Sequence, residues 1–127
     1  MKAAKLTQTQ QKAIDEAMTM YEEAQASFED WFMHSRWTGG YHEHYESFEE
    51  AVEDNYRWLA RRDSRNDQEG YIAKQLAFCR RHYEEHRAGI VTMRMSSNTL
   101  RAIAKKGYIE IIEDNYRQSD KFRLLCI

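Results

Sequence analysis

The sequence contains no proline, two cysteines and five glycines among 127 residues. Because proline is absent, the glycines are the strongest chain breakers that remain. Cys79 and Cys126 form no CxxC pair and are too few for a disulfide framework, so we expect both to be reduced. No stretch without Asp, Glu, Lys or Arg is longer than six residues, so we expect no membrane-spanning segment and no secretory signal. These absences predict a cytoplasmic protein with no membrane partner.

The remaining composition is typical of one folded domain. Apolar residues make up 42% of the chain and charged residues 31%, which is enough for a packed core under a charged surface and argues against disorder. A chain of this length has about the size of one domain, so we predict a single domain over residues 1–127. Within it we predict a helical region over residues 1–89 and a structurally different tail over residues 90–127.

The net charge of −2 conceals an uneven distribution along the chain. Residues 1–56 carry 4 Lys and Arg against 12 Asp and Glu, whereas residues 57–127 carry 15 against 9. An acidic half followed by a basic half is compatible with self-association, with a basic face for an anionic partner such as nucleic acid, or with an ordinary mixed surface. The charge pattern alone leaves these alternatives open.

Three helices are predicted in the helical region. Apolar residues recur at helical spacing over residues 8–34, after a capping-box signal at Thr7, and predict one long helix. A second capping-box signal at Ser47 begins the second helix. The third helix follows Asp67 and is expected to end before Gly89, because glycine favours the position just past a helix C-terminus.

The tail has a different periodicity. Residues 90–95 alternate and are rich in β-branched side chains, which predicts a strand. A short helix capped by Ser96 or Ser97 follows, and residues 108–113 and 121–127 are predicted to form a β-hairpin. The expected fold class is therefore α+β, with three N-terminal helices followed by a strand, a short helix and a β-hairpin.

The segment Ser97-Asn-Thr-Leu-Arg-Ala-Ile-Ala-Lys-Lys-Gly-Tyr-Ile-Glu-Ile-Ile and the later Phe122-Arg-Leu-Leu carry a family resemblance. They are similar to the recognition helix and wing of winged helix-turn-helix DNA-binding proteins, in which a T-L-x-x-L-x-K-x-G-hydrophobic-I segment leads from the helix into the first wing strand. The resemblance covers about 30 of the 127 residues. The sequence differs from that family in two respects. A strand is predicted at the position where the family has a short helix. The sequence pI is near 6.2, whereas DNA-binding domains are typically basic.

The resemblance implies that the short helix and the hairpin contact double-stranded DNA. With the apolar residues turned inward, Asn98, Arg101 and Lys105 share the outer helix face at positions i, i+3 and i+7. Asn and Arg pair bidentately with adenine and guanine edges, and further Lys and Arg residues could hold phosphates. An ordinary solvated helix face has the same spacing. The candidate nucleic-acid-binding residues are Asn98, Arg101, Lys105, Lys106, Arg117, Lys121 and Arg123.

Histidines provide the one signal for metal chemistry. The segment from His82 to His86 matches the H-x-x-E-H signature of a class of zinc proteases. Such an enzyme also needs a third ligand and a substrate cleft, and a chain this short offers little room for either. We interpret His82 and His86 as ordinary surface residues and expect no metal, no cofactor and no enzymatic activity.

Two further patterns bear on partners. The densest apolar concentration is aromatic, and we expect it to form core, with a partner surface as the alternative; it comprises Phe28, Trp31, Phe32, Trp37, Tyr41 and Tyr45. The pentapeptide Glu-Asp-Asn-Tyr-Arg occurs at residues 53–57 and 113–117, but the flanking residues align poorly, which favours coincidence over duplication.

Together these patterns predict a small DNA-binding regulatory protein of the kind that mobile genetic elements encode. A homodimer is expected, because a two-fold pair would present two recognition helices to a pseudo-palindromic site. The alternative is a non-enzymatic protein–protein interaction module, an adaptor or inhibitor, that uses the acidic helical half.

Overall fold

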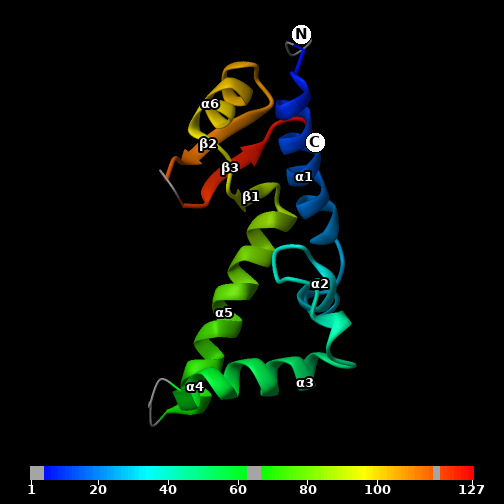
Figure 1. Cartoon of the computed structure of the whole chain (residues 1–127), viewed down its shortest axis with the longest axis vertical. Coiled ribbons are helices and arrows are strands. Elements are labelled where there is room, and N and C mark those ends of the chain that lie inside the picture. The colour runs from blue at the N-terminus through cyan, green and yellow to red at the C-terminus, as the bar shows by residue number, and fades with distance from the viewer. Residues whose placement is uncertain (1–4, 63–66, 116–117) are drawn as a thin grey trace. The chain divides into compact units, whose positions relative to one another are not determined.

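The computed structural model describes residues 5–62, 67–115 and 118–127 (Figure 1). Helices come first and a three-stranded antiparallel sheet forms near the C-terminus, which confirms the predicted α+β fold class. The chain divides into two compact units. We call Met1–Glu22 with Glu85–Ile127 the sheet unit, and Glu23–Glu84 the helical unit. No helix in the described ranges is long and apolar enough to cross a membrane.

The helices follow one another in the order labelled in Figure 1. In chain order they are α1 (Gln8–Glu23), α2 (Phe28–His34), the 3₁₀ turn η1 (Tyr41–Glu43), α3 (Phe48–Val52), the π-helical segment η2 (Glu53–Arg57), α4 (Trp58–Arg62), α5 (Gln68–Arg87) and α6 (Ser97–Lys105). The segments α3, η2 and α4 follow each other without a break and correspond to the predicted second helix. The third predicted helix is α5.

The prediction of one long helix over residues 8–34 is wrong, because the chain breaks between α1 and α2. Ser27 is the N-cap of α2, and its Oγ accepts the Asp30 backbone N–H at 3.3 Å. The carboxylates of Glu29 and Asp30 lie in the first turn of α2, where the helix dipole favours negative charge. The capping residues thus begin a second helix although the apolar residues keep their helical spacing across the break. Among the described residues, the helical region therefore has one helix more than predicted.

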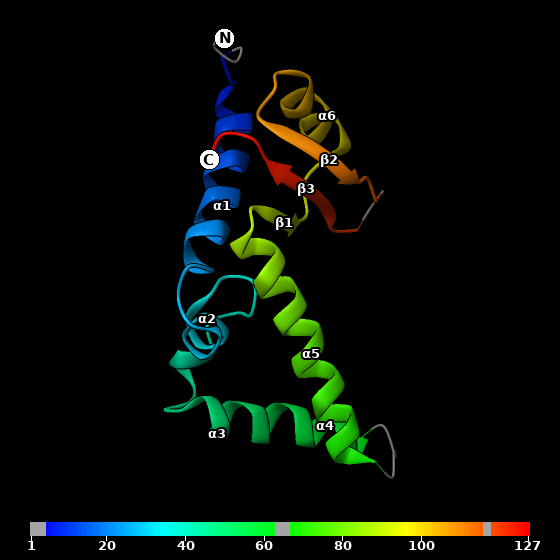
Figure 2. The same ribbon diagram turned by 180° about the vertical axis from the view of Figure 1, so that it is seen from behind.

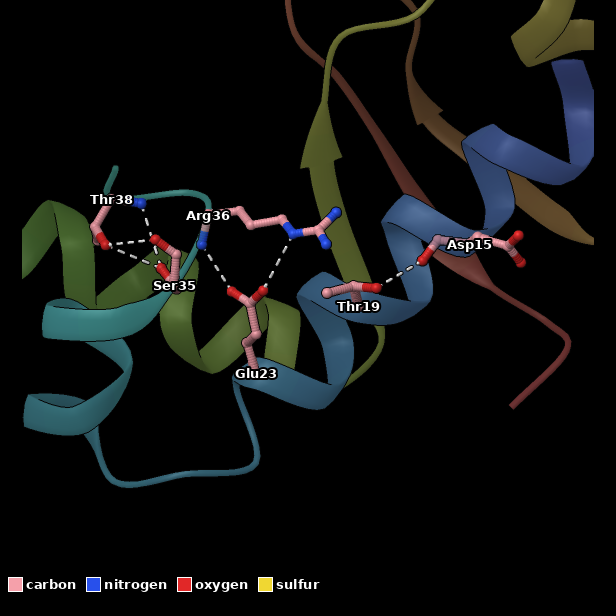
Figure 3. A network of polar contacts seen from close by, with 6 residues as sticks. All are labelled: Asp15, Thr19, Glu23, Ser35, Arg36 and Thr38. Carbon is pink, nitrogen blue, oxygen red and sulfur yellow. Dashed lines mark hydrogen bonds and ion pairs between the residues drawn. The ribbon is translucent and has the colours of Figure 1, made fainter. Parts of the chain in front are cut away.

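The end of α2 is fixed by side chains of the helical unit (Figure 3). The Arg36 backbone N–H donates to Glu23 Oε2 at 2.7 Å, and Arg36 Nε lies 3.7 Å from Glu23 Oε1. Ser35 Oγ accepts the Thr38 backbone N–H at 3.2 Å, which closes a turn directly after the helix. These bonds satisfy polar backbone groups where the chain leaves α2.

The core of the helical unit is mainly aromatic. Phe28, Trp31 and Phe32 are buried. The hydroxyl group of Tyr56 and the thiol group of Cys79 form a hydrogen bond of 3.2 Å in the same core. The other members of the predicted aromatic cluster are partly buried against this core; they are Trp37, Tyr41 and Tyr45. The cluster therefore packs the core, as expected.

The sheet unit contains the predicted strand, helix and hairpin. The strands are β1 (Ile90–Met93), β2 (Ile109–Glu113) and β3 (Asp120–Leu124), in the spatial order β1-β3-β2 with both pairs antiparallel. The register is interrupted between Ile111 and Glu113, which leaves Ile112 as a bulged residue. Because side chains alternate along a strand, Val91 and Phe122 face the core while Lys121 faces away from it.

Helices α1 and α6 lie beside this sheet (Figures 1 and 2). Ile14 and Ala17 from α1 share one buried cluster with Leu100 and Ile103 from α6 and with the inward residues of the strands. The tail therefore buries its apolar face together with a helix from the beginning of the chain. The sheet unit thus combines residues from both ends of the chain, which differs from the predicted boundary between a helical region and a tail at residue 89. The expectation of a single domain stays a prediction.

Candidate nucleic-acid interface

Helix α6 presents an exposed polar face above a buried apolar one. Ser96 is its N-cap, and Ser96 Oγ accepts the Thr99 backbone N–H at 3.2 Å. Leu100 and Ile103 are fully buried. The candidate residues Asn98, Arg101 and Lys105 are all exposed. The helical period therefore placed these three side chains correctly on the outer face of α6.

Arg101 is held by a carboxylate from the hairpin. Its Nε and Nη2 atoms both lie 3.2 Å from Asp114 Oδ2, while the Arg101 side chain remains 68% exposed. An exposed pair of this kind contributes at most about 1 kcal/mol to stability. It orients the guanidinium towards Asp114 and offsets one positive charge on the candidate face.

Lys106 has an internal structural role. Its Nζ donates to the Lys5 backbone carbonyl at 3.1 Å and to Gln10 Oε1 at 2.5 Å. Gln10 also accepts the Thr7 backbone N–H, which confirms the capping box predicted at the start of α1. Lys106 therefore joins the end of α6 to the start of α1 and does not belong to the exposed face.

Two other candidate residues lie on the opposite face of the sheet. Lys121 and Arg123 alternate with the core residue Phe122 along β3, so they face away from the buried cluster that contains α6. Lys121 Nζ is 2.8 Å from Glu85 Oε2, and both side chains are largely buried. Arg123 Nη1 lies 3.7 Å from Glu110 Oε1 across the strand pair. The structure does not bring these two residues together with the face of α6. Candidate Arg117 lies outside the described residues.

The base of the hairpin is braced by polar contacts. Asp120 is buried, and its Oδ1 accepts the Asn115 backbone N–H at 2.7 Å. The Asn115 side-chain amide donates to the Ser119 carbonyl at 3.1 Å. These bonds hold the two strand ends together and position Asp114 beside Arg101.

Arg94 is an exposed cation that the sequence reasoning missed. It lies in the three-residue connection between β1 and α6 and is exposed. Continuing the inward alternation of Val91 and Met93 by one residue would have placed Arg94 on the outside. The same short connection leaves no room for a further helix, so a strand does precede α6 where the family has a helix.

The expectation that His82 and His86 are surface residues is wrong. His82 is 6% exposed and its ring stacks on Trp37 with centroids 4.6 Å apart. His86 is completely buried, and its Nε2 accepts the Thr92 backbone N–H at 3.2 Å. Among the described residues, no group of three or more His, Cys, Asp or Glu side chains is arranged to hold a metal ion.

No protein-family model matches this chain, and neither a curated protein nor a solved structure matches it.

Proposed function

We propose that the protein is a small, non-enzymatic DNA-binding regulator that reads duplex DNA with the outer face of α6. The observation that carries the proposal is the exposure of Asn98, Arg101 and Lys105 along one helix face whose opposite side is anchored in the core. The sheet unit also carries 11 Lys and Arg against 8 Asp and Glu, a positive balance that favours an anionic partner.

Each residue of this face has a role that its chemistry suits. An α-helix fits the major groove of B-DNA, where Asn98 would pair with an adenine edge and Arg101 with a guanine edge. Asp114 would keep the Arg101 guanidinium in one orientation and so favour base reading over diffuse phosphate contact. Lys105 and Arg94 would contact phosphates at the two ends of the helix.

We further propose that the protein acts in the cytoplasm as a homodimer on a pseudo-palindromic site. A single nine-residue helix reads only a few base pairs, and a two-fold pair would double that number. The centre-to-centre spacing of the half-sites would then be about 10 base pairs or a multiple of it.

Gel-shift titrations against arbitrary and selected duplexes test this function. Arg101→Ala is expected to weaken binding by about 1–3 kcal/mol and to relax the preference at one base position. Lys105→Ala is expected to weaken all sequences equally and to lower the salt slope by about one unit. Arg123→Ala, on the opposite face of the sheet, is the matched control and is expected to bind like the wild type.

Two results would contradict the proposal. The first is the absence of any duplex binding by the wild-type protein at low salt. The second is an Arg101→Ala protein that binds with the affinity and base preference of the Arg123→Ala control.

A further inference from the structure

The helical unit contains an open pocket of about 470 Å³. Its walls come from the loop before α3 and from the uninterrupted helix formed by α3, η2 and α4. The pocket is lined by Tyr45, Glu50, Glu53, Asp54, Trp58 and Arg61. Two aromatic rings and three carboxylates thus surround one space, with a single cation among them.

Trp58 is the most exposed large apolar side chain among the described residues, at 56%. Trp is enriched among the interface residues that dominate binding energy. The Arg62 guanidinium already lies 5.5 Å from the centre of the Trp58 ring. Arg62 thus occupies one face of the indole, and a planar cation from a partner would stack on the opposite face.

The carboxylates of the pocket are held in place. Asp54 Oδ2 accepts the Tyr45 hydroxyl at 2.5 Å, which couples one aromatic wall to one acidic wall. Glu53 is fixed by Arg57 at 2.5 Å, and Glu50 Oε2 accepts the Glu46 backbone N–H at 3.3 Å. Each of these groups keeps lone pairs for a further donor, because a carboxylate has about four acceptor positions.

Local charge decides which kind of ligand suits the pocket. Residues 37–62, which include every residue that lines the pocket, carry six Asp and Glu against three Arg, a net charge of −3. This charge repels anions such as nucleic acid and attracts cations. The π-helical segment η2 provides Glu53 and Asp54, and such segments are rare and occur frequently at functional sites.

We propose that this pocket binds an arginine side chain from a basic segment of a partner protein. The planar guanidinium stacks on an aromatic face and donates two parallel hydrogen bonds to a carboxylate, which a compact ammonium group cannot do. Trp58 provides the face, and Asp54 with Glu50 provides the acceptors. This site uses residues of the helical unit alone, so it does not rest on DNA binding by α6.

Calorimetric titration of the full chain with a defined probe tests the site. The probe is the peptide acetyl-Gly-Arg-Gly-Arg-Gly-amide, and its control has citrulline, a neutral isostere, in place of both arginines. The arginine peptide is expected to bind at low salt, and the citrulline peptide at least about 10-fold more weakly, because it lacks the charge that cation–π and ionic contacts require. Trp58→Ala and Asp54→Asn are each expected to weaken the arginine peptide by about 10-fold.

Two variants serve as matched controls. Phe78 is also an exposed aromatic residue of the helical unit, at 47%, with a guanidinium, that of Arg81, 5.4 Å from its ring centre, but it lines no part of the pocket. Phe78→Ala and the charge control Glu84→Gln are expected to bind the arginine peptide like the wild type. Circular dichroism checks that each variant is folded. If Trp58→Ala does not fold, the affinity of Asp54→Asn for the arginine peptide tests the site.

Three outcomes would overturn the proposal. One is the absence of binding by the wild-type protein, and another is an equal loss of affinity in Asp54→Asn and Glu84→Gln, which would indicate diffuse attraction. The third is a homodimer in sedimentation equilibrium that Trp58→Ala dissociates, because the occupant would then be a second copy of this chain. The first two outcomes leave the DNA titrations of α6 variants unaffected, and the third replaces the partner protein by the homodimer that the DNA proposal expects, so the two proposals fail separately.

Discussion

Arg101 and Asp114 contact each other across thirteen residues of sequence, with two guanidinium nitrogens 3.2 Å from a single carboxylate oxygen. The contact joins the exposed face of α6 to the end of β2. It leaves the remaining guanidinium nitrogen and most of the side chain accessible to a partner. In the proposed complex the carboxylate has two opposing effects, since it orients the arginine and also repels phosphate.

Asp114→Asn separates these two effects. The substitution removes a negative charge beside the proposed interface, so binding to arbitrary duplex DNA is expected to become tighter by about 3-fold at low salt. The preference at the base read by Arg101 is expected to decrease, because the guanidinium loses its anchor. Glu113→Gln controls for charge alone and is expected to keep the base preference. Weaker binding of Asp114→Asn to all sequences would contradict both roles.

Leu100→Ala tests the core of the sheet unit. Leu100 is fully buried in the cluster that also contains Ile14 of α1, so the substitution is expected to lower the free energy of unfolding by about 2–5 kcal/mol. Phe32→Ala empties the corresponding position in the core of the helical unit and is expected to cost about 3–5 kcal/mol. Urea unfolding followed by circular dichroism measures both values.

The same pair of variants tests the prediction of a single domain. If residues 1–127 unfold as one domain, Leu100→Ala and Phe32→Ala both shift one common transition. Two transitions, each moved by only one of the variants, would show that the sheet unit and the helical unit unfold independently.

His86 is expected to be important for stability rather than for metal binding. His86→Ala leaves the Thr92 N–H without its acceptor and opens a cavity at a completely buried position, which together are expected to cost about 3 kcal/mol. His34, an exposed histidine of the helical unit, provides the control, and His34→Ala is expected to change stability by less than about 0.5 kcal/mol. A chelator is expected to change neither result, and stoichiometric zinc in protein purified without added metal would contradict this prediction.

Stability is expected to decrease at alkaline pH. Burial raises the pKa of the Cys79 thiol, and burial together with the hydrogen bond to Cys79 raises the pKa of Tyr56. A group whose pKa is raised by folding stabilises the protein below its unfolded pKa, and this contribution is lost as the pH rises toward the folded value. In the unfolded chain a cysteine thiol has a pKa of about 8.5. The free energy of unfolding is therefore expected to decrease above about pH 9. The decrease is expected to be less steep in Cys79→Ala, which lacks the buried thiol, than in the control Cys126→Ala, which lacks an exposed one. Equal slopes in the two variants would contradict the assignment.

The elements of the tail were predictable because they depend on neighbouring residues. Alternating side chains specify β1, a serine cap and a glycine delimit α6, and the hairpin strands were found at nearly the predicted positions. The break at Ser27 was missed because the apolar period continues across it, although Ser27 and Asp30 have the spacing of a helix cap. There the local capping signal prevailed over the periodicity.

The candidate site was only half predictable, for a related reason. The helical period places Asn98, Arg101 and Lys105 on one face without reference to any other part of the chain. The partners of Lys106 and Lys121 are distant in sequence, and no local pattern shows that Gln10 and Glu85 occupy these two ammonium groups. Lys106 and Lys121 were therefore predicted to be available for DNA phosphates, although each ammonium group already contacts a distant side chain of the same chain.

The repeated pentapeptide shows how strongly context decides conformation. At residues 53–57 the sequence Glu-Asp-Asn-Tyr-Arg is a π-helical segment. In the second copy, Glu113 ends β2, and Asp114 and Asn115 are not helical. Tyr116 and Arg117 lie outside the described residues, and the first three residues of the pentapeptide thus adopt two backbone conformations in the two copies.

The sheet unit is assembled from two stretches of chain that the whole helical unit separates. On a ribosome, α1 is synthesised well before β1, so its apolar face has no sheet to pack on until the C-terminal stretch has emerged. The residues of the helical unit are complete in the nascent chain before then, and their core can form first. Early folding there shortens the flexible loop that must close to bring Ile14 to Leu100, which reduces the entropic barrier to the last step. The order of synthesis thus favours a folding pathway in which the inserted segment folds first and the unit around it last.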